Sequence, residues 1–376
     1  MNLPSHVDVC VVGGGQSALA LGYYLRRAER ERQRRGHPPL SVVLLDRRDG
    51  PGGAWLDAWP SLRLFSPAGY SSLPGRLMPT PADGTAPDAA HVVAYLADYE
   101  QRYDLDVRRP VVVEDLVGAE DGRGPTEVRT DHGHVQARAV VNATGTWDRP
   151  FWPRLPGIEQ FAGRQLHTHD YRGPDAFAGK RVLVVGGGNS GAQIAADLLG
   201  TAQAVHWVTR EPPRYLPDDV DGRVLFEVAT RAVRARAAGE QAEGVGSLGD
   251  IVVVPPVRAA RDRGELHADP LPERLTRHGA TWSDGHSVDL DVVVWATGFR
   301  PALGHLRGLD LPRRRGVPVT VAPEGATSEM RSADGSPLWF LGYGDWCGAA
   351  SATLIGVGRP AKEVAADVVA HLDSPG

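Results

Sequence analysis

The hydrophobic and polar positions of the chain follow one order that occurs twice. An apolar run, Val7–Val12, leads into glycines 13–15 and then into Ser17–Arg27, whose apolar residues have helical spacing. The same order returns at 181–199, where an apolar run precedes glycines 186–188 and a second helical stripe. Strand, glycine turn and helix in this order are typical of α/β proteins, so the pattern predicts two related nucleotide-binding domains.

The glycines of both turns match the spacing that binds a dinucleotide pyrophosphate. The pattern has a glycine for the tight turn, a second for close approach of the backbone to the phosphates, and a small third residue where helix and strand pack. The first turn supplies Gly13, Gly15 and Ala18, and the second supplies Gly186, Gly188 and Gly191. The N-terminus of the following helix then faces the anion.

A second apolar strand follows each turn and ends in a charged residue, which is acidic after the first turn and basic after the second. Asp46 follows Val42–Leu45, and a carboxylate at this position can bind the ribose hydroxyls of an adenosine. Asp46 lies further from its turn than usual, which we attribute to a helix extended by the charged run Glu29–Arg35. Arg210 follows Val205–Thr209 and suits a 2′-phosphate, although Glu211 adjoins it. We expect both sites to bind a dinucleotide. The alternative is that one site is functional and the other is a decayed copy.

Two dinucleotides in one chain indicate a relay in which a nicotinamide reduces a flavin. Three further segments favour a flavin: Gly52-Gly53-Ala54-Trp55, the Ala-Thr-Gly segments at 143–145 and 296–298, and Gly342-Tyr343-Gly344-Asp345. Asp345 follows a short apolar strand, where an aspartate can bind a ribityl chain. We expect the segment from Ser351 to Val369 after it to be helical, with its N-terminus stabilising charge on a reduced flavin.

Composition narrows the class of protein. A chain of 376 residues exceeds one small module, and a net charge of −5 disfavours a basic nucleic-acid-binding surface. Two cysteines, Cys10 and Cys347, are too few for a disulfide-stapled fold or a thiolate zinc site. No apolar run is long enough to span a membrane. We therefore expect a cytoplasmic protein that binds neither nucleic acid nor membrane, and a homodimer is compatible with the sequence.

Between the two turns lies a segment that carries a family resemblance. Phe161, Gly163, His167 and Tyr171 match the FxGxxxHxxxY/F pattern of the flavin-containing monooxygenases. With both glycine turns, Gly-Gly-x-Trp and both Ala-Thr-Gly segments, the resemblance covers nearly the whole chain. Segments 59–67 and 351–358 look like the compact flavin-dependent monooxygenases found with arsenic-resistance genes, from which no arsenic substrate is inferred.

The resemblance implies an α/β fold in which a Rossmann-like FAD domain, residues 1–165 and 300–376, contains an inserted NADPH domain, 166–299. It implies FAD contacts from residues of the first turn, strand ends and flavin motifs: Gly13, Gly15, Gln16, Ser17, Ala18, Asp46, Arg47, Gly53, Trp55, Val113, Ala143, Thr144, Gly145 and Asp345. It implies NADPH contacts from the second turn and strand: Gly186, Gly188, Asn189, Ser190, Gly191 and Arg210. Candidate walls of the flavin pocket are Phe65, Ser66, Asn189, Trp346 and Cys347.

The family chemistry needs no side-chain nucleophile. NADPH reduces FAD, dioxygen adds to flavin C4a, and the hydroperoxide transfers one oxygen to a soft nucleophile such as nitrogen, sulfur or arsenic. Arg172 follows Tyr171 where ester-forming relatives have Trp-Pro, and Phe65 stands where many N- and S-oxygenating relatives have an asparagine. The alternative is an NADPH-dependent flavin reductase that passes electrons to a quinone, a metal species or a partner protein. A third possibility is a flavin-bearing redox sensor. We expect no metal at His167 and His169, because no carboxylate or cysteine completes a site.

Overall fold

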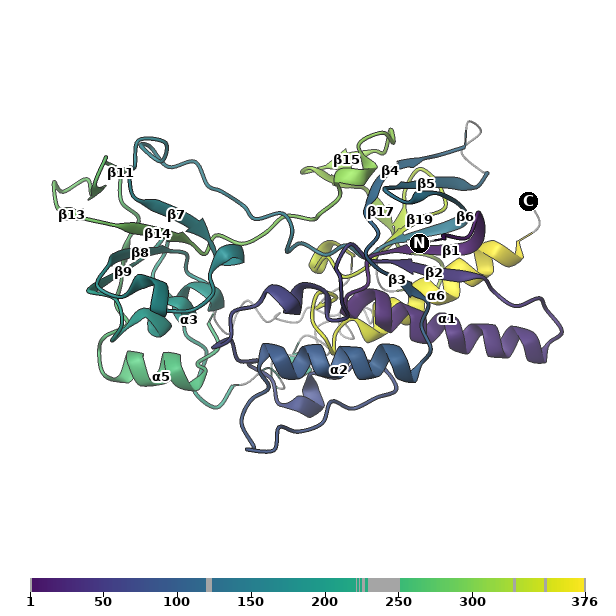
Figure 1. Ribbon diagram of the computed structural model, residues 1–376, viewed down its shortest axis with the longest axis horizontal. Coiled ribbons are helices and arrows are strands. Elements are labelled where there is room, and N and C mark those ends of the chain that lie inside the picture. Colours follow the sequence, from purple (N-terminus) through teal and green to yellow (C-terminus); the bar gives the residue numbers. More distant parts are fainter. Residues whose placement is uncertain are drawn as a thin grey trace.

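A computed structural model of the chain describes residues 2–119, 124–220, 251–326, 329–347 and 350–374, together with positions 222, 224, 227 and 228. Two lobes lie side by side along the long axis, and residues 143–163 and 296–303, here called the crossing segments, run between their sheets (Figure 1). Each lobe is built on its own sheet. No helix in the described part of the chain is long and apolar enough to cross a membrane.

The first sheet has the order β17-β18-β19-β6-β1-β2-β3, with β4 and β5 continuing from β6. Its centre is parallel, from β19 through β6, β1 and β2 to β3. Its strands are β1 (His6–Val12), β2 (Val42–Leu45), β3 (Val107–Arg108), β4 (Val113–Val117), β5 (Thr126–Thr130), β6 (Gly133–Asn142), β17 (Thr320–Val321), β18 (Arg331–Ser332) and β19 (Leu338–Phe340).

Three helices cover one face of this sheet: α1 (Gln16–Arg34), α2 (Ala89–Arg102) and α6 (Gly358–Asp373). Alternate residues of β1 explain the two layers, because Val9 and Val11 pack among these helices while Cys10 and Val12 pack with β4, β5 and residues 303–311. Helix α1 continues through the charged run to Arg34, which confirms the predicted extension before Asp46.

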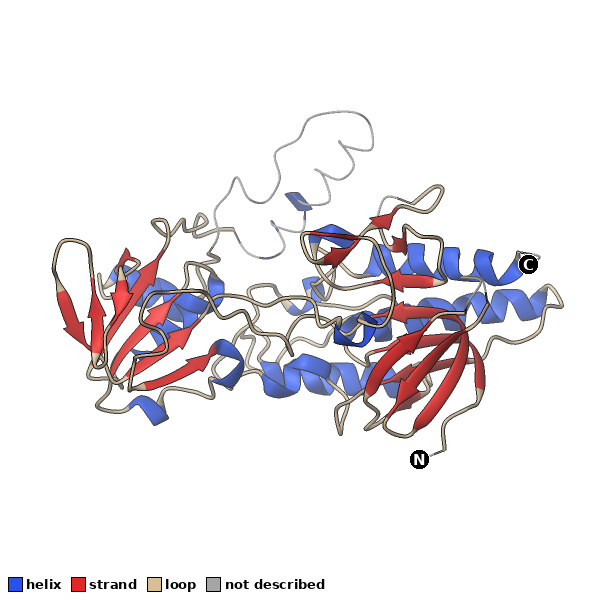
Figure 2. Ribbon diagram, turned by 90° about the horizontal axis from the view of Figure 1, so that it is seen from above, coloured by secondary structure: helices blue, strands red, loops and turns tan. Residues whose placement is uncertain are grey.

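The second sheet is all parallel, with the order β10-β9-β8-β14-β7. Its strands are β7 (Arg164–His167), β8 (Arg181–Val185), β9 (Ala204–Thr209), β10 (Ala268–Pro270) and β14 (Val292–Trp295). Helices α3 (Asn189–Leu198) and α5 (Pro255–Asp262) pack on one face. A small sheet of β11 (Arg274–Leu275), β12 (Gly279–Thr281) and β13 (Ser287–Asp289) packs on the other, and β15 (Arg313–Arg314) pairs with β16 (Val317–Pro318) in the first lobe (Figure 2). Continuous apolar runs suit strands buried on both faces.

The helix expected from Ser351 begins only at Gly358, so that prediction is wrong for residues 351–357. The Thr353 hydroxyl donates to the Ala350 carbonyl and accepts from the Gly356 amide, which fixes a tight turn. Ala350 has φ +59°, a backbone conformation that a right-handed helix does not contain. The structure thus replaces the first two turns of the expected helix with a compact loop beside the first glycine turn.

Candidate functional site: two glycine turns and a cavity

The first glycine turn lies against the first Ala-Thr-Gly segment. Gly13 has φ +118°, and a Cβ atom there would lie 2.5 Å from the Ala143 carbonyl oxygen. Only glycine fits this position, since a side chain would meet the backbone of the neighbouring strand end. Gly15 is the N-cap of α1 and meets only Gly53 Cα, at 3.8 Å, so the space in front of the helix is open.

The Gly-Gly-x-Trp segment contacts the same turn, in the 3₁₀ turn η1 (Gly53–Asp57). Gly53 has φ +57°, and its backbone approaches Gly15 so closely that a Cβ would lie 2.8 Å from Gly15 Cα. The Trp55 indole Nε1 donates to Gln16 Oε1 at 3.0 Å, and Gln16 Nε2 donates to the Ala352 carbonyl at 2.8 Å. Three segments far apart in sequence therefore meet at the N-terminus of α1.

Thr144 joins the first Ala-Thr-Gly segment to the C-terminal part of the chain. Its hydroxyl donates to the Ala302 carbonyl at 2.8 Å and lies 2.7 Å from the Tyr343 hydroxyl, which also accepts from the Thr144 amide. Burial raises the pKa of Tyr343, so the phenol remains protonated. The sequence analysis did not select Tyr343 as a site residue, although it lies in the Gly-Tyr-Gly-Asp segment. Asp345 begins the 3₁₀ turn η7, and its side chain lies outside the described residues.

These segments enclose a cavity of about 580 Å³. Ligand cavities of this size are typical for cofactors. Of the residues expected to contact FAD, the cavity is lined by Gly13, Gly15, Gln16, Ser17, Asp46, Arg47, Gly53, Trp55, Val113, Ala143, Thr144 and Gly145. Ala18 is instead fully buried in α1, as a residue that packs helix against strand. The open helix N-terminus and the missing side chain at Gly15 fit a dinucleotide.

Two histidines are buried, His305 beside the cavity and His167 at the end of β7. His305 Nε2 lies 2.7 Å from Asn142 Oδ1, and Asn142 Nδ2 donates to the Trp339 carbonyl, so the ring nitrogen is the donor. Burial lowers the pKa of His305 to about 4. Burial also lowers the pKa of His167 to about 4, against the opposing effect of the Gly298 carbonyl. His305 was not selected from the sequence, and His167 lies in the buried linker motif.

We expect these histidines to make stability fall as pH decreases. Both stay neutral in the folded chain down to about pH 4, whereas the unfolded chain protonates near pH 6.5. Each can therefore cost up to about 1.4 kcal/mol per pH unit between these values. His305→Gln should remove up to about 2 kcal/mol of the fall in the free energy of unfolding between pH 7.5 and pH 5, measured by urea titration. The exposed-site variant His37→Gln is the control, and equal pH dependence in all three proteins would contradict the expectation.

The second glycine turn repeats the geometry of the first. Gly186 has φ +145°, and a Cβ there would lie 2.2 Å from the Ala296 carbonyl of the second Ala-Thr-Gly segment. A Cβ on Gly191 would lie 2.1 Å from the Gly186 carbonyl, so this glycine allows helix and strand to pack closely. Gly188 is the N-cap of α3 and has open space before it, and Ser190 lies half-buried in the first turn of that helix.

The polar residue after the second strand is free for a ligand. Arg210 follows β9 directly and is exposed, and no ion pair in the described part of the chain includes it. Asn189 has a supporting contact, because its Oδ1 accepts from the Val252 amide at 2.8 Å. The expected wall of the flavin pocket therefore includes a residue that also holds segment 251–254.

The other candidate wall residues lie in two different places. Phe65 packs against the core of the second lobe, and its carbonyl accepts from the Gly222 amide at 2.8 Å, while Ser66 lies next to Gly222. Trp346 packs on Phe340 and Tyr343. Cys347 is fully buried, where its Sγ accepts from the Tyr343 amide. None of the four belongs to the lining of the described 580 Å³ cavity, and their contact with a flavin stays a prediction.

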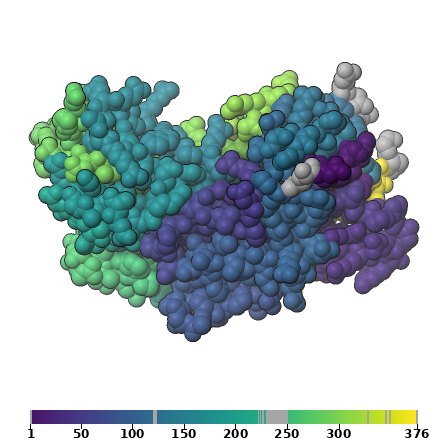
Figure 3. Space-filling model, in the orientation of Figure 1, coloured from purple at the N-terminus to yellow at the C-terminus, as the bar shows by residue number. Residues whose placement is uncertain are grey.

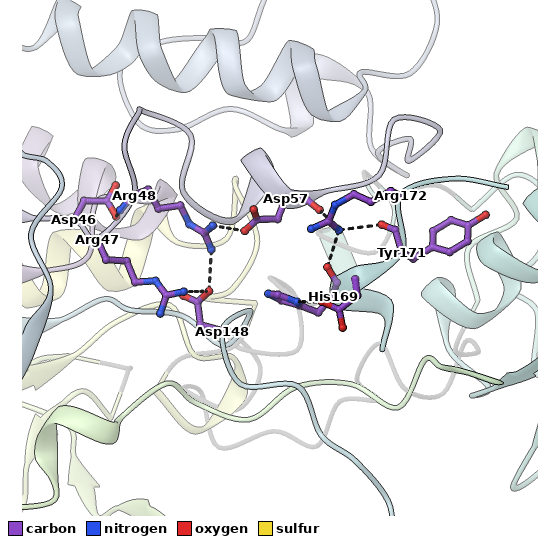
Figure 4. A network of polar contacts seen from close by, with 9 residues as sticks. Asp46, Arg47, Arg48, Asp57, Asp148, His169, Tyr171 and Arg172 are labelled. Atoms are coloured by element: carbon purple, nitrogen blue, oxygen red, sulfur yellow. Dashed lines mark hydrogen bonds and ion pairs between the residues drawn. The ribbon is translucent and has the colours of Figure 1, made fainter. Parts of the chain in front are cut away.

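Sequence reasoning missed a charged network between the lobes (Figure 4). Arg48 binds both Asp57 and Asp148, and Arg47 also donates to Asp148, at 2.9 Å. On the other side, Arg172 Nη1 donates to the Asp57 carbonyl at 3.2 Å and to the His169 carbonyl at 2.7 Å. Asp57, Asp148 and His169 lie close enough to hold a metal, but the arginines neutralise both carboxylates. We therefore interpret the network as a contact between the lobes.

Segment 59–65 is a second contact that local patterns do not reveal. Trp59 belongs to the first half of the sequence but is buried in the core of the second lobe, where its ring meets Tyr171 edge to face at 5.9 Å. The hydroxyls of Ser61 and Tyr171 both donate to Asp197 Oδ2, at 2.8 and 2.7 Å. Tyr171 of the linker motif thus has a docking role.

Comparisons with known proteins agree with this geometry. A flavin-containing monooxygenase from Stenotrophomonas maltophilia is 46% identical, with a TM-score of 0.84, over 98% of this chain and 99% of that chain. A doubly substituted form of it is 47% identical, with a TM-score of 0.85 and the same coverage. The chain belongs to the flavin-containing monooxygenase family.

Two family models and two further relatives are also compatible with this flavin monooxygenase assignment. Residues 53–228 match the family model "Pyridine nucleotide-disulphide oxidoreductase", and residues 11–58 match "NAD(P)-binding Rossmann-like domain". An uncharacterized CzcO-like oxidoreductase from Geobacillus kaustophilus is 27% identical over 97% of this chain and 99% of its own length. A probable indole-3-pyruvate monooxygenase, YUCCA4 of Arabidopsis thaliana, is 27% identical over 85% of this chain and 82% of its own. The flavin monooxygenase described here is thus an NADPH-dependent flavoprotein oxidoreductase with the cofactors FAD and NADPH.

Proposed function

We propose that this monooxygenase inserts one oxygen atom of dioxygen into a soft nucleophile, with FAD in the 580 Å³ cavity and NADPH at the second glycine turn. The observation that carries the proposal is the pairing of the two crossing segments. The Phe151 amide donates to the Gly298 carbonyl, the Arg300 amide to Arg149, and the Ala302 amide to Gly145, each at 2.9 Å. Both Ala-Thr-Gly segments therefore lie along one connection, and both nucleotide turns contact it.

The residues of this chain bind and orient the two cofactors. When bound, FAD accepts the nicotinamide hydride and activates dioxygen. The N-terminus of α1 is open to a pyrophosphate, and Trp55 and Gln16 fix the loop beside it. Trp147 stacks on Phe299 at 4.8 Å, so the two crossing segments also contact each other through aromatic rings. The space-filling view shows that the surface is hollowed between the two lobes (Figure 3). A small substrate can approach there.

Thiol chemistry of a disulfide reductase does not fit this chain. Cys10 and Cys347 are its two cysteines, and both are fully buried on separate elements. Burial raises the pKa of Cys10 to about 12, which disfavours the reactive thiolate. The domain division belongs to the same proposal: the first sheet uses strands from 6–142 and 320–340 and the second from 164–295, so the limit at 299/300 is kept, whereas the limit expected at 165/166 cuts β7 and is moved to before Arg164.

A substrate panel tests the proposal. Amines, thioethers, thiols and trivalent arsenicals are incubated with NADPH and dioxygen, and NADPH loss, hydrogen peroxide and product are measured together. For a substrate we expect one product per NADPH, because one oxygen atom enters the product and the other leaves as water. Turnover with a quinone acceptor, and peroxide instead of an oxygenated product with every candidate, would favour the reductase.

A further inference from the structure

We propose that Arg109, held in place by Glu100, positions the Asp46 carboxylate for the adenosine ribose of FAD. Asp46 follows β2 and lines the cavity, yet its side chain is only 6% exposed. Arg109 Nε donates to Asp46 Oδ2 at 2.9 Å. The proposal rests on the FAD site proposed above. It names Arg109 as the residue that holds Asp46 in position to bind the ribose hydroxyls.

Glu100 of α2 fixes the direction of the arginine. Its two carboxylate oxygens accept from Arg109 Nη1 at 2.6 Å and from Nη2 at 2.8 Å. The Gly14 carbonyl lies 3.4 Å from Nη2. All three guanidinium nitrogens are therefore engaged, and the bidentate pair turns Nε toward Asp46.

This arrangement leaves one side of the Asp46 carboxylate for a ligand. Oδ2 takes the Arg109 bond, while the partner of Oδ1 among the described residues is the Arg48 amide, at 3.3 Å. A Cβ atom on Gly14 would lie 2.5 Å from Asp46 Oδ2, so the glycine allows the carboxylate to lie directly against the first turn. The backbone on both sides is also fixed, since the Asp46 carbonyl accepts from the Val111 amide at 2.8 Å.

Arg109 also differs from an arginine that receives a phosphate. Its side chain is 9% exposed and its nitrogens are occupied, whereas Arg210, which follows β9 as Asp46 follows β2, is exposed. The first lobe thus offers a carboxylate to ribose hydroxyls and the second offers a free cation to a 2′-phosphate. Arg109 is accordingly a positioning residue that makes the first site specific for an unphosphorylated ribose.

The test compares FAD with an FAD analogue whose adenosine ribose lacks both hydroxyls. Both are titrated into the full chain stripped of flavin, and binding is followed by flavin fluorescence. We expect the unmodified chain to prefer FAD by about tenfold or more, as for loss of a charge-assisted hydrogen bond. Arg109→Met should reduce this preference to within about threefold, as Asp46→Asn should. Arg138→Met, which removes an arginine–Asp8 pair at the opposite end of the same sheet, is the control and should keep it.

A merely structural role for Arg109 predicts a different result. Both ligands would then weaken equally in Arg109→Met, and an unchanged preference would overturn the proposal. If that variant does not fold, Glu100→Gln decides, because an arginine released from Glu100 can take both Asp46 oxygens and the preference should again fall. Unchanged preference there would overturn the proposal too. An unmodified chain that binds neither ligand would instead refute the FAD site itself.

Discussion

Gly15→Leu is expected to abolish FAD binding and leave a folded, colourless protein. The backbone at Gly15 has φ −83°, which any residue adopts, and the nearest atom to a Cβ there is Gly53 Cα at 3.8 Å. The chain therefore has room for a Cβ atom at this position, whereas a leucine side chain would occupy the space that a pyrophosphate needs at the helix N-terminus. Loss of two charge-assisted contacts of about 1.5–3 kcal/mol each corresponds to at least roughly a 100-fold loss of FAD affinity.

The matched variant is Gly188→Leu. Gly188 is the N-cap of α3 with open space around it, just as Gly15 is the N-cap of α1. This variant should keep its flavin spectrum and lose reduction by NADPH. Flavin content and NADPH titrations of the two proteins, with circular dichroism for folding, make the comparison. A folded Gly15→Leu protein with the normal flavin content and affinity would contradict the assignment of the first turn.

Arg210→Ala is expected to weaken NADPH by roughly 10- to 150-fold and leave NADH nearly unchanged. Arg210 is exposed immediately after β9, so its removal disturbs no core residue. One charge-assisted contact with the 2′-phosphate, about 1.5–3 kcal/mol, accounts for this range. Flavin reduction by each nicotinamide in rapid mixing gives both affinities.

Arg263→Ala is the control for Arg210, since it removes another exposed arginine of the same lobe, one paired with Glu265. It should leave both affinities unchanged. Equal weakening of NADPH and NADH in Arg210→Ala would move the phosphate site elsewhere. A preference of the unmodified chain for NADH would remove the basis for a 2′-phosphate site at this position.

Local sequence signals were sufficient for the two glycine turns, because a buried parallel strand, a turn that needs glycine and an amphipathic helix each leave a short-range pattern. They identified β2 and β8 with the bounds that the structure has. Local signals failed where a loop competes with a helix, as at 351–357, since the Thr353 side chain bonds the backbone there.

Contacts between distant segments could not be predicted in the same way. Arg109 meets Asp46 across 63 positions of sequence, and Trp59 enters the core of the other lobe. Neither residue has a periodic pattern that indicates its partner. The charged network of Arg48, Asp57 and Asp148 likewise depends on how the crossing segment lies against β2, which only the fold defines.

The most direct test of the account is the fate of labelled dioxygen. The flavin-loaded chain is incubated with NADPH, ¹⁸O₂ and the panel compound that best stimulates NADPH oxidation, and the product mass is determined. The account predicts one ¹⁸O atom in each product molecule, with no label taken up from H₂¹⁸O in the reverse experiment. Product that carries oxygen from water, or NADPH oxidation that yields labelled hydrogen peroxide and no oxygenated product with any compound, would contradict it.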